Sequence, residues 1–371
     1  MSAGRGWTGL LAGVLVAAGF GTAGCAAKAP TARPTSPAPS PSTSPGQASW
    51  VDDAVSFSAA DMTVYGTFRH PAGPGAVPAA LLIAGSGPTD RNGDSALLPG
   101  HADTLRNLAQ ALAADGVATL RYDKLGTGQT GLGPYAANPA QVDISAFQGE
   151  ATAALQFLAG QAGIDRTRLL VIGHSEGALY ALTLATAAPG VVPPVRAVGL
   201  LEPASRRILD EVSEQAHAQA EAGVRAGRLT PAQAAESTAA IDKAIGEFRD
   251  TGQVPRDEPP GLRPIINAAN ARALAEEDAL DPAALAAKVP RGTPVFLTCS
   301  DADRQIPCSD VDLVLAGLSG AGAKVDYVHL TGVDHVLKQD PGGTDYGNPL
   351  PFSAQLVGAL ASFVRENVTT P

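Results

Sequence analysis

A serine with a glycine two positions away on either side is the pattern in this sequence that carries the most chemistry. Residues 173–177 read Gly-His-Ser-Glu-Gly, after the apolar run 169–172 and before the helix-forming segment 178–182. A sharp turn from a strand to a helix needs small residues at those two places, because the backbone is pinched and the hydroxyl must project clear of the sheet. The helix behind Ser175 would also direct unpaired backbone N–H groups at the site. We interpret Ser175 as a candidate nucleophile; an ordinary strand-to-helix turn with a serine cap is the alternative.

A base for Ser175 must come from one of six histidines. A serine hydroxyl is a poor nucleophile near neutral pH, so a base must take its proton and a third group must hold that base. In the fold implied by the order of elements described below, the base comes last, after the acid, which leaves His329 and His335. His329 lies within a predicted strand, where a histidine more often packs against its neighbours, whereas His335 lies on a loop beyond it. We expect His335 to be the base.

The acid is expected from the loop that follows the predicted strand 294–298. This loop contains Asp301 and Asp303. Asp303 is followed by two variable residues, an aliphatic residue and Pro307, which resembles the pattern around the acid in the hydrolase fold. Asp301 is better suited to shape the turn or to cap a backbone N–H. We favour Asp303, with Asp301 as the alternative and Glu202, just after the preceding strand, as a third possibility.

Acyl transfer also needs donors for the oxyanion of a tetrahedral intermediate. The backbone N–H of Glu176 is one candidate, because it follows Ser175 at the start of the predicted helix. The second is expected from the loop 84–88, Ala-Gly-Ser-Gly-Pro, whose glycines let the backbone approach a substrate. Within this loop we choose the Ser86 N–H. The polar stretch 89–94 is interpreted as a solvated loop, with lining of the pocket as the alternative.

Alternating strands and helices would position these residues. The expected strands are residues 54–59, 62–69, 79–83, 117–122, 169–172, 196–201, 294–298 and 325–330. The expected helices are residues 104–114, 144–158, the helix behind Ser175, 311–318 and 353–364. This alternation predicts an α/β fold, with a mostly parallel central sheet of about eight strands, helices on both faces and an antiparallel hairpin at its start. The core is expected over residues 50–201 and 290–371.

The stretch 202–289 interrupts the alternation, because it contains no convincing strand. Apolar residues fall on one helical face of residues 209–224, and Thr230-Pro231-Ala232-Gln233 has the form of a capping box with proline at the first helical position. Pro264 and Pro282 mark two further expected helix starts. We interpret residues 202–289 as a helical cap that follows a strand and covers a ligand crevice. A separate partner-binding domain is the alternative.

Residues 1–24 are interpreted as a signal peptide, because an apolar, glycine-broken segment follows Arg5 and ends in small residues. The end of this segment, Thr22-Ala23-Gly24-Cys25, resembles a bacterial lipobox. That resemblance implies that Cys25 is lipidated and anchors the protein to the extracytoplasmic side of the cell membrane. Residues 25–49, rich in Pro, Ser and Thr, would then be a disordered tether. Plain secretion and an uncleaved anchor are the alternatives.

The chain has only three cysteines. With Cys25 in the lipobox, Cys299 and Cys308 make an even pair in an oxidising compartment. Their close spacing permits a small disulfide loop around Asp303, and two free thiols are the alternative. Neither cysteine has further Cys or His residues at the spacing of a zinc site.

Composition narrows the classes of partner. The 371 residues carry 26 basic and 36 acidic side chains, a net charge of -10, and no basic stripe. Nucleic acid is therefore not an expected partner. Hydrophobic residues make up 45% of the chain, enough for a sizeable core in one or two domains. Nothing in the sequence indicates an oligomeric state.

Several of these segments together resemble the α/β-hydrolase superfamily over residues 53–368: the elbow at Ser175, the loop 84–88, the Asp303 loop, the late His335, and the segment 121–128, Arg-Tyr-Asp-Lys-Leu-Gly-Thr-Gly. More narrowly, they are similar to bacterial EstD-type carboxylesterases. The resemblance implies hydrolysis of small-molecule carboxylic esters through an acyl-enzyme, with a Ser175-His335-Asp303 triad and without metal or organic cofactor. A serine peptidase or aminopeptidase on the same fold and a noncatalytic surface-binding lipoprotein are the alternatives.

Overall fold

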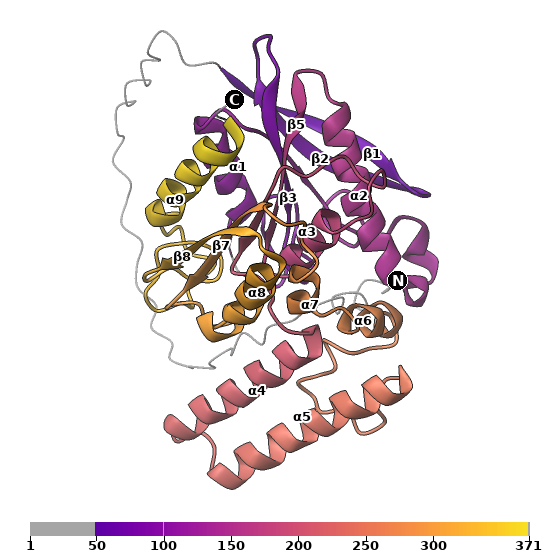
Figure 1. Cartoon of the computed structure of the whole chain (residues 1–371). Helices are drawn as coiled ribbons and strands as arrows, with labels where there is room; N and C mark the ends of the chain where they lie inside the picture. Colours follow the sequence, from indigo (N-terminus) through magenta and orange to yellow (C-terminus); the bar gives the residue numbers. More distant parts are fainter. Residues whose placement is uncertain (1–48, 99, 370–371) are drawn as a thin grey trace, which may run out of the picture.

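The computed structural model describes residues 49–98 and 100–369, and an eight-stranded sheet runs through its centre (Figure 1). The strand order is β1-β2-β4-β3-β5-β6-β7-β8. The first two pairings, β1 with β2 and β2 with β4, are antiparallel, and all the others are parallel. The strands are β1 (Trp50–Ala59), β2 (Met62–Pro71), β3 (Val77–Ile83), β4 (Ala118–Tyr122), β5 (Ile164–His174), β6 (Ala197–Leu201), β7 (Pro294–Ser300) and β8 (Lys324–Leu330). The predicted mostly parallel α/β sheet with an antiparallel hairpin at its start is confirmed.

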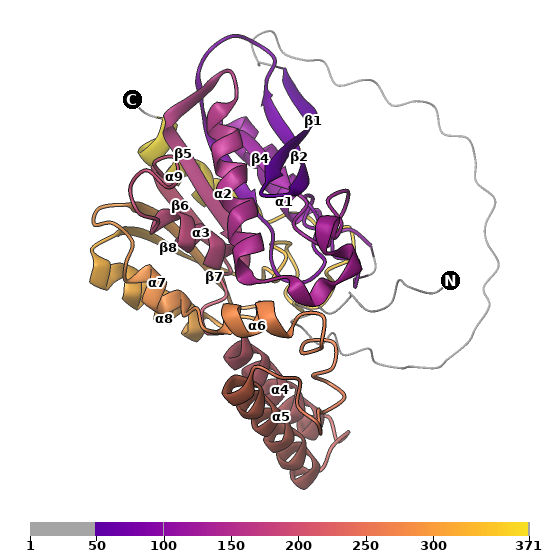
Figure 2. The same cartoon turned by 90° about the vertical axis from the view of Figure 1, so that its right-hand side faces the viewer.

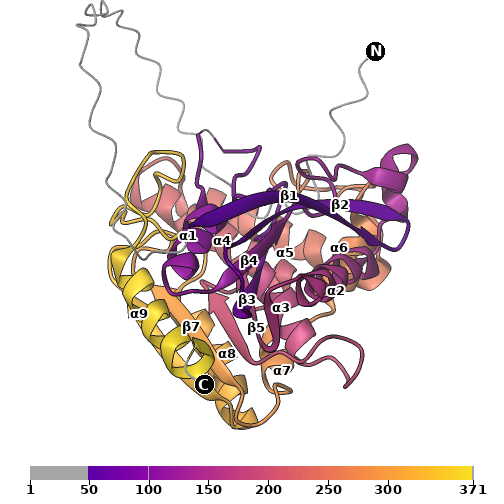
Figure 3. The ribbon, with the colours of Figure 1, turned by 90° about the horizontal axis from the view of Figure 1, so that it is seen from above.

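Helices cover both faces of the sheet (Figures 2 and 3). One face carries α1 (Thr104–Ala114) and α9 (Ala354–Val364), which the short helix η3 (Arg365–Thr369) extends. The other face carries α2 (Ile144–Gly160), α3 (Gly177–Ala185), α7 (Pro282–Ala286) and α8 (Cys308–Ala321). Two short 3-10 helices, η1 (Gly133–Ala137) and η2 (Pro139–Gln141), lead into α2.

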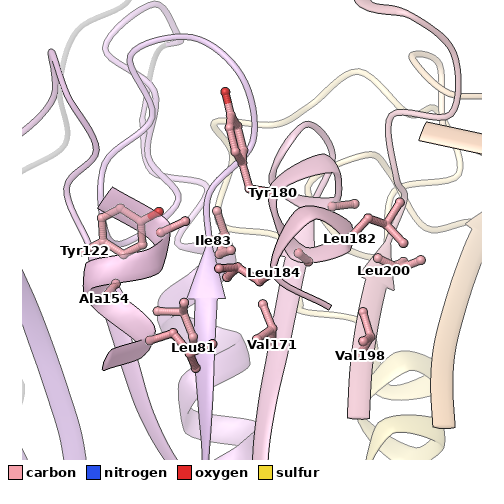
Figure 4. Close-up of a cluster of buried hydrophobic side chains, with 14 of the residues drawn as sticks. Leu81, Ile83, Tyr122, Ala154, Val171, Tyr180, Leu182, Leu184, Val198 and Leu200 are labelled. Atoms are coloured by element: carbon pink, nitrogen blue, oxygen red, sulfur yellow. The ribbon is translucent and has the colours of Figure 1, made fainter. Parts of the chain in front are cut away.

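The core follows from the alternation of side chains along buried strands. Leu81 and Val171 point to the face that α2 and α3 cover, whereas Leu82 and Ile172 point to the face of α1 and α9. Because both faces are covered, the central parallel strands are continuous apolar runs. Figure 4 shows part of the buried apolar cluster on the face covered by α2 and α3, where these helices meet β3, β5 and β6.

Hydropathy predicted the centres of the elements better than their ends. The apolar run 169–172 is only part of β5, which begins at Ile164 because that residue continues the parallel ladder with Val77 of β3. Likewise α8 begins at Cys308, directly after Pro307, three residues before its first buried apolar position at Val311. Backbone pairing and capping set these boundaries, and neither requires an apolar side chain.

The insertion after β6 forms a helical hairpin that extends away from the sheet (Figures 1 and 2). Its helices are α4 (Ile208–Arg225) and α5 (Pro231–Thr251), followed by α6 (Ala271–Asp278). Thr230 and Gln233 form the predicted capping box at the start of α5. The hairpin and α6 share a separate small core that includes Leu209, Val212, Phe248, Ile266 and Leu274. Helix α7, by contrast, packs with α8 in the core of the main sheet, through Ala286.

One expected helix start in the insertion is wrong. Pro264 lies in a run of turns, in which Ile265 N–H donates to the carbonyl of Leu262. The next helix starts only after Asn270, whose side-chain amide donates to the Ile265 carbonyl at 2.7 Å. Proline suits the first turn of a helix, but it equally suits a turn. The start expected at Pro282 is confirmed, because Asp281 accepts hydrogen bonds from the N–H groups of Ala283 and Ala284.

Two predictions fall wholly or largely outside the described residues: the signal peptide, and the lipidated Cys25 with its tether. Within residues 49–98 and 100–369, the structure contains no helix with the length and apolar character needed to cross a membrane.

Candidate active site

Ser175 occupies a sharp turn between β5 and α3. Its backbone φ is +54°, in the left-handed region that L-residues other than glycine seldom adopt. A Cβ on Gly173 would clash with the backbone of Gly177, and a Cβ on Gly177 would clash with the Ile83 carbonyl of the neighbouring strand. The elbow therefore requires both glycines, as the sequence predicts. A strained residue at the carboxyl edge of a parallel sheet is where function is expected.

His335 and Asp303 meet although 32 residues separate them. His335 Nδ1 lies 2.7 Å from Asp303 Oδ2, and both side chains are buried. The second oxygen, Asp303 Oδ1, accepts hydrogen bonds from the N–H groups of Gln305 at 2.7 Å and Ile306 at 3.1 Å. These contacts hold the Asp303 carboxylate against Nδ1 of His335, so Nε2 is the ring nitrogen that can act on a substrate.

The charges of this pair support each other. Burial disfavours the ionised form of Asp303, but His335 and the two backbone donors outweigh burial and hold the pKa of Asp303 below its usual range. Burial also opposes the His335 imidazolium, yet the adjacent Asp303 carboxylate raises the pKa of His335 above its usual value. Asp303 is thus an anion that stabilises a protonated His335.

His174 connects this pair to the elbow. It immediately precedes Ser175, and its Nε2 lies 2.6 Å from the backbone carbonyl oxygen of His335. The two imidazole rings lie 5.0 Å apart between centroids. Burial and the nearby His335 lower the pKa of His174 to about 3, so its ring is neutral and donates to that carbonyl. The loop that carries His335 is therefore held against the residue next to Ser175.

The alternatives for acid and base lie elsewhere. Asp301 Oδ1 accepts the Gly332 N–H at 2.6 Å and shapes the turn between the two loops. His329 lies on β8 as predicted, where its ring packs on Tyr327 at 4.4 Å. Neither residue takes part in the contact between His335 and Asp303.

Glu202, the third possible acid, is buried behind Asp303. It follows β6 with a φ of +43°, and its Oε1 accepts a hydrogen bond from the Thr298 hydroxyl at 3.2 Å. Burial raises the pKa of Glu202 well above its usual range, and the neighbouring Asp303 carboxylate raises it further. The shift favours the protonated form of Glu202, and its hydrogen bond to Thr298 lies apart from the contact between His335 and Asp303.

Both expected oxyanion donors line one small cavity with Ser175. The cavity measures about 20 Å³, room for roughly one water molecule, and its wall includes Ser86 and Glu176. Among the described residues, neither the Ser86 N–H nor the Glu176 N–H has a hydrogen-bond acceptor. The loop 84–88 can pass this close to Ser175 because residue 85 is glycine; a Cβ there would lie 3.0 Å from the Ser175 Cβ.

The first two turns of α4 form the opposite wall of this cavity. This wall consists of Ile208, Glu211, Val212 and Gln215. Glu211 is held there by the N–H groups of Ser205 at 2.7 Å and Arg206 at 3.1 Å, and burial raises its pKa to about 7. The sequence identified the apolar face of α4 but contained no signal that placed it over Ser175. This placement favours the cap interpretation over a separate partner-binding domain.

The loop 89–94 is anchored to the sheet, contrary to the expectation of a solvated loop. Arg91 forms an ion pair with Asp123 at 2.6 Å, and its guanidinium also donates to the Gly66 carbonyl at 2.8 Å. The Arg121 guanidinium, in turn, donates to the side chain of Asn92. The turn-forming residues of this loop did not reveal these charged partners, because Arg121 on β4 and Asp123 just after it are distant in the chain.

The predicted disulfide between Cys299 and Cys308 is present. It joins the carboxyl end of strand β7 to the first residue of α8 and encloses the loop that carries Asp303. The disulfide thus joins the two ends of this loop, which limits the positions available to the Asp303 carboxylate.

Comparison with known proteins agrees with this geometry. Residues 98–241 match the family model described as serine aminopeptidase, S33. Among curated proteins, none matches the sequence. The structure of Est1E from Butyrivibrio proteoclasticus with ferulic acid bound is 15% identical, with a TM-score of 0.53, over 85% of this chain and 100% of that one.

Two structures from Pyrococcus species have similar TM-scores. An esterase of Pyrococcus furiosus is 13% identical, with a TM-score of 0.53, over 86% of this chain and 92% of that one. The acylaminoacyl peptidase of Pyrococcus horikoshii is 15% identical, with a TM-score of 0.52, over 88% of this chain but only 43% of that one. At such identities the likeness concerns the fold alone. With the strand order and the elbow at Ser175, it shows that this chain has the α/β-hydrolase fold.

Proposed function

We propose that this protein is a serine hydrolase that cleaves carboxylic esters through an acyl-enzyme. The observation that carries the proposal is the contact between His335 and Asp303, held by His174 against the elbow that presents Ser175. A nucleophile, a base and an oriented acid are the three groups that acyl transfer by serine requires. The match to a family of serine hydrolases over residues 98–241 supports the same reaction class.

The proposed reaction uses these groups in turn. His335 accepts the hydroxyl proton of Ser175 as the serine oxygen bonds to the ester carbonyl carbon, and the carbonyl electron pair moves onto oxygen. The N–H groups of Ser86 and Glu176 stabilise that oxyanion. Collapse expels the alkoxide, which takes the proton from His335. Water then attacks the acyl group by the same sequence and regenerates Ser175.

A short acyl group is the substrate that suits the cavity best. The space beside Ser175 is small, and Ile208 and Val212 of α4 close it with apolar side chains. Longer chains require α4 to move outward. The hairpin of α4 and α5 has its own core and extends from the sheet, so such a movement leaves the main core intact.

A serine peptidase is the second candidate. The description of the matching family as serine aminopeptidase favours it, and the acylaminoacyl peptidase of Pyrococcus horikoshii shares the fold. An ester leaving group needs less protonation than an amine leaving group. The ratio of ester to amide hydrolysis rates therefore distinguishes an esterase from a peptidase on this fold.

The deciding experiment uses p-nitrophenyl esters from acetate to octanoate and a panel of aminoacyl and dipeptide amides. Wild type and Ser175→Ala are assayed side by side, and a fluorophosphonate probe measures the folded, reactive serine. We expect Ser175-dependent turnover of the short esters that exceeds turnover of every amide. Equal turnover by both proteins contradicts the mechanism, and faster amide cleavage establishes the peptidase. Absence of labelling in folded protein revives the noncatalytic binding protein.

The proposed location is the extracytoplasmic face of the cell membrane, through a lipid on Cys25. The disulfide between Cys299 and Cys308 supports an oxidising compartment. Metabolic labelling with an alkynyl fatty acid tests this proposal, with Cys25→Ser as the control. Release of the wild-type protein into the medium without label indicates plain secretion instead.

A further inference from the structure

Lys124 is a buried cation that the proposed reaction does not use. It lies two residues beyond β4, in the segment 121–128, and its side chain is only 9% exposed. The ammonium Nζ donates to the backbone carbonyl oxygen of Gly85 at 2.5 Å and to Glu176 Oε2 at 3.1 Å. A buried lysine is costly unless its charge is paired and its donors are satisfied, so these two contacts explain why it is tolerated.

The contact with Gly85 sets the direction of a proposed oxyanion donor. The Gly85 carbonyl and the Ser86 N–H belong to the same peptide unit, which is planar and trans. In that geometry the C=O and N–H bonds point in opposite directions. When Lys124 holds the carbonyl oxygen on one side, the Ser86 N–H must point to the other side, where Ser86 lines the cavity of Ser175.

The same contact also strengthens that donor. A positive charge on a carbonyl oxygen polarises the peptide group, and hydrogen bonds in a chain reinforce one another in a medium of low dielectric. The Ser86 N–H therefore carries more positive charge than the N–H of an unbound peptide. The polarisation of the peptide adds to the orientation of the Ser86 N–H, and both are lost when the ammonium group is removed.

The second contact reaches the other proposed donor. Glu176 contributes its backbone N–H to the cavity while its carboxylate pairs with Lys124. One ammonium group thus joins the loop 84–88 to the nucleophile elbow. On its far side Glu176 meets Glu277 of α6; burial and the Glu176 carboxylate raise the pKa of Glu277 well above its usual range. Lys124 is accordingly the cation that balances Glu176 at this junction.

We propose that Lys124 is a positioning residue that assembles the oxyanion hole, by orienting and polarising the Gly85–Ser86 peptide and by tying it to Glu176. The inference rests on the proposed serine hydrolase activity. Within the segment 121–128, Arg121 and Asp123 hold the loop 89–94. Lys124 instead contacts the loop 84–88, so the proposal gives it a separate role.

The test compares Lys124→Met with wild type, using p-nitrophenyl butyrate and an alkyl trifluoromethyl ketone. The ketone accepts the Ser175 oxygen at its carbonyl carbon, His335 takes the proton, and the ketone oxygen becomes an oxyanion. Misplaced donors stabilise this oxyanion less, whereas the binding of the ground-state ester depends on them little. We expect kcat to fall about 100-fold, KM to change less than threefold, and the inhibition constant of the ketone to rise in parallel with the loss of kcat/KM.

Matched variants separate this role from stability. Lys243→Met makes the same change on the exposed surface of α5, and we expect wild-type kinetics from it. Lys124→Met leaves the buried Glu176 carboxylate without its cation, so the double variant Lys124→Met/Glu176→Gln provides a folded background if the single variant is unstable. Rates are expressed per serine labelled to completion by the fluorophosphonate probe. Lys124→Arg, which keeps a charged donor, should recover part of kcat.

The outcomes distinguish the two proposals. If Ser175→Ala abolishes turnover while kcat and ketone affinity of the folded Lys124 variants stay within twofold of wild type, the positioning role is wrong and the hydrolase proposal stands. The positioning role is also wrong if KM rises while kcat and ketone affinity are unchanged. If Ser175→Ala is as active as wild type, the proposed function itself fails.

Discussion

His335 Nδ1 lies 2.7 Å from Asp303 Oδ2, and neither side chain is more than 5% exposed. The contact joins the loop after β7 to the loop after β8 at the carboxyl edge of the sheet. Because Nδ1–H donates to the Asp303 carboxylate, the imidazole stays in the tautomer whose Nε2 accepts a proton. This relationship makes the roles of individual residues testable.

Replacement of Asp303 should abolish most of the activity. Asp303→Asn keeps the volume but removes the charge that stabilises the imidazolium, and we expect kcat to fall about 10⁴-fold. The measurement is the initial rate on p-nitrophenyl butyrate, with folding checked by circular dichroism. Asp301→Asn is the matched control in the same loop, and its kcat should stay within threefold of wild type. A larger loss from the control than from Asp303→Asn reverses the assignment of the acid.

The pH dependence of kcat/KM should report His335. A general base acts in its neutral form, so kcat/KM rises as pH rises through the pKa of His335. That pKa lies above the usual value of 6.5, because the Asp303 carboxylate outweighs burial. We expect the midpoint above 6.5 in wild type and a lower midpoint for the residual activity of Asp303→Asn. A midpoint that Asp303→Asn leaves unchanged indicates that another group limits the rate.

A smaller side chain on α4 should lengthen the preferred acyl chain. Val212 lines the cavity beside Ser175, and Val212→Ala removes two methyl groups from its wall. We expect kcat/KM for hexanoate relative to acetate to rise about tenfold. The control is Val224→Ala, the same substitution in a groove between α4 and α5 that does not include Ser175, which should leave the ratio unchanged. Equal chain-length profiles for wild type and Val212→Ala rule out α4 as the wall that selects the acyl group.

Loss of the disulfide should weaken both stability and activity. The bond between Cys299 and Cys308 closes a short loop, and its removal is expected to lower the free energy of unfolding by about 3 kcal/mol. The double variant Cys299→Ser/Cys308→Ser, and wild type in dithiothreitol, are compared by thermal unfolding and by kcat. The freed loop positions Asp303 less well, so kcat should also fall. Unchanged activity and melting temperature in strong reductant contradict both expectations.

Glu150 should make stability depend on pH. It is buried on α2, where burial raises its pKa to about 8 in the folded protein, against an ordinary value of 4.5. Between these pH values the unfolded chain has lost the proton that the folded chain keeps. The free energy of unfolding therefore falls as pH rises, by at most about 1.4 kcal/mol per pH unit from this group.

Urea unfolding at pH 5, 6.5 and 8 measures this slope. Glu150→Gln should reduce it, because glutamine does not ionise and still accepts the Leu125 N–H. Glu236→Gln, on the exposed face of α5, is the control and should leave the slope unchanged. Identical slopes for wild type and Glu150→Gln indicate that the buried carboxyl is already neutralised by another route.

The sequence by itself determined the features that depend on local sterics and on periodicity. Two glycines around Ser175 predict the elbow, because any Cβ there meets backbone atoms. Continuous apolar runs predict the central strands, and the loop sequences after β7 and β8 single out Asp303 and His335. The close spacing of Cys299 and Cys308 likewise predicts their bond. Each of these predictions needs only neighbours along the chain or a sheet whose strands end at one edge.

Tertiary structure decided the contacts between segments that no local rule relates. It placed α4 over Ser175, Glu202 behind Asp303 and Arg91 against Asp123. It also placed Lys124 on the Gly85 carbonyl, 39 residues away in the chain. The physical reason is that a buried charge or an apolar helix face can be satisfied by many partners of suitable chemistry. Packing of the whole chain selects one of them, and in this protein that selection shapes the cavity beside Ser175 and the proposed oxyanion hole.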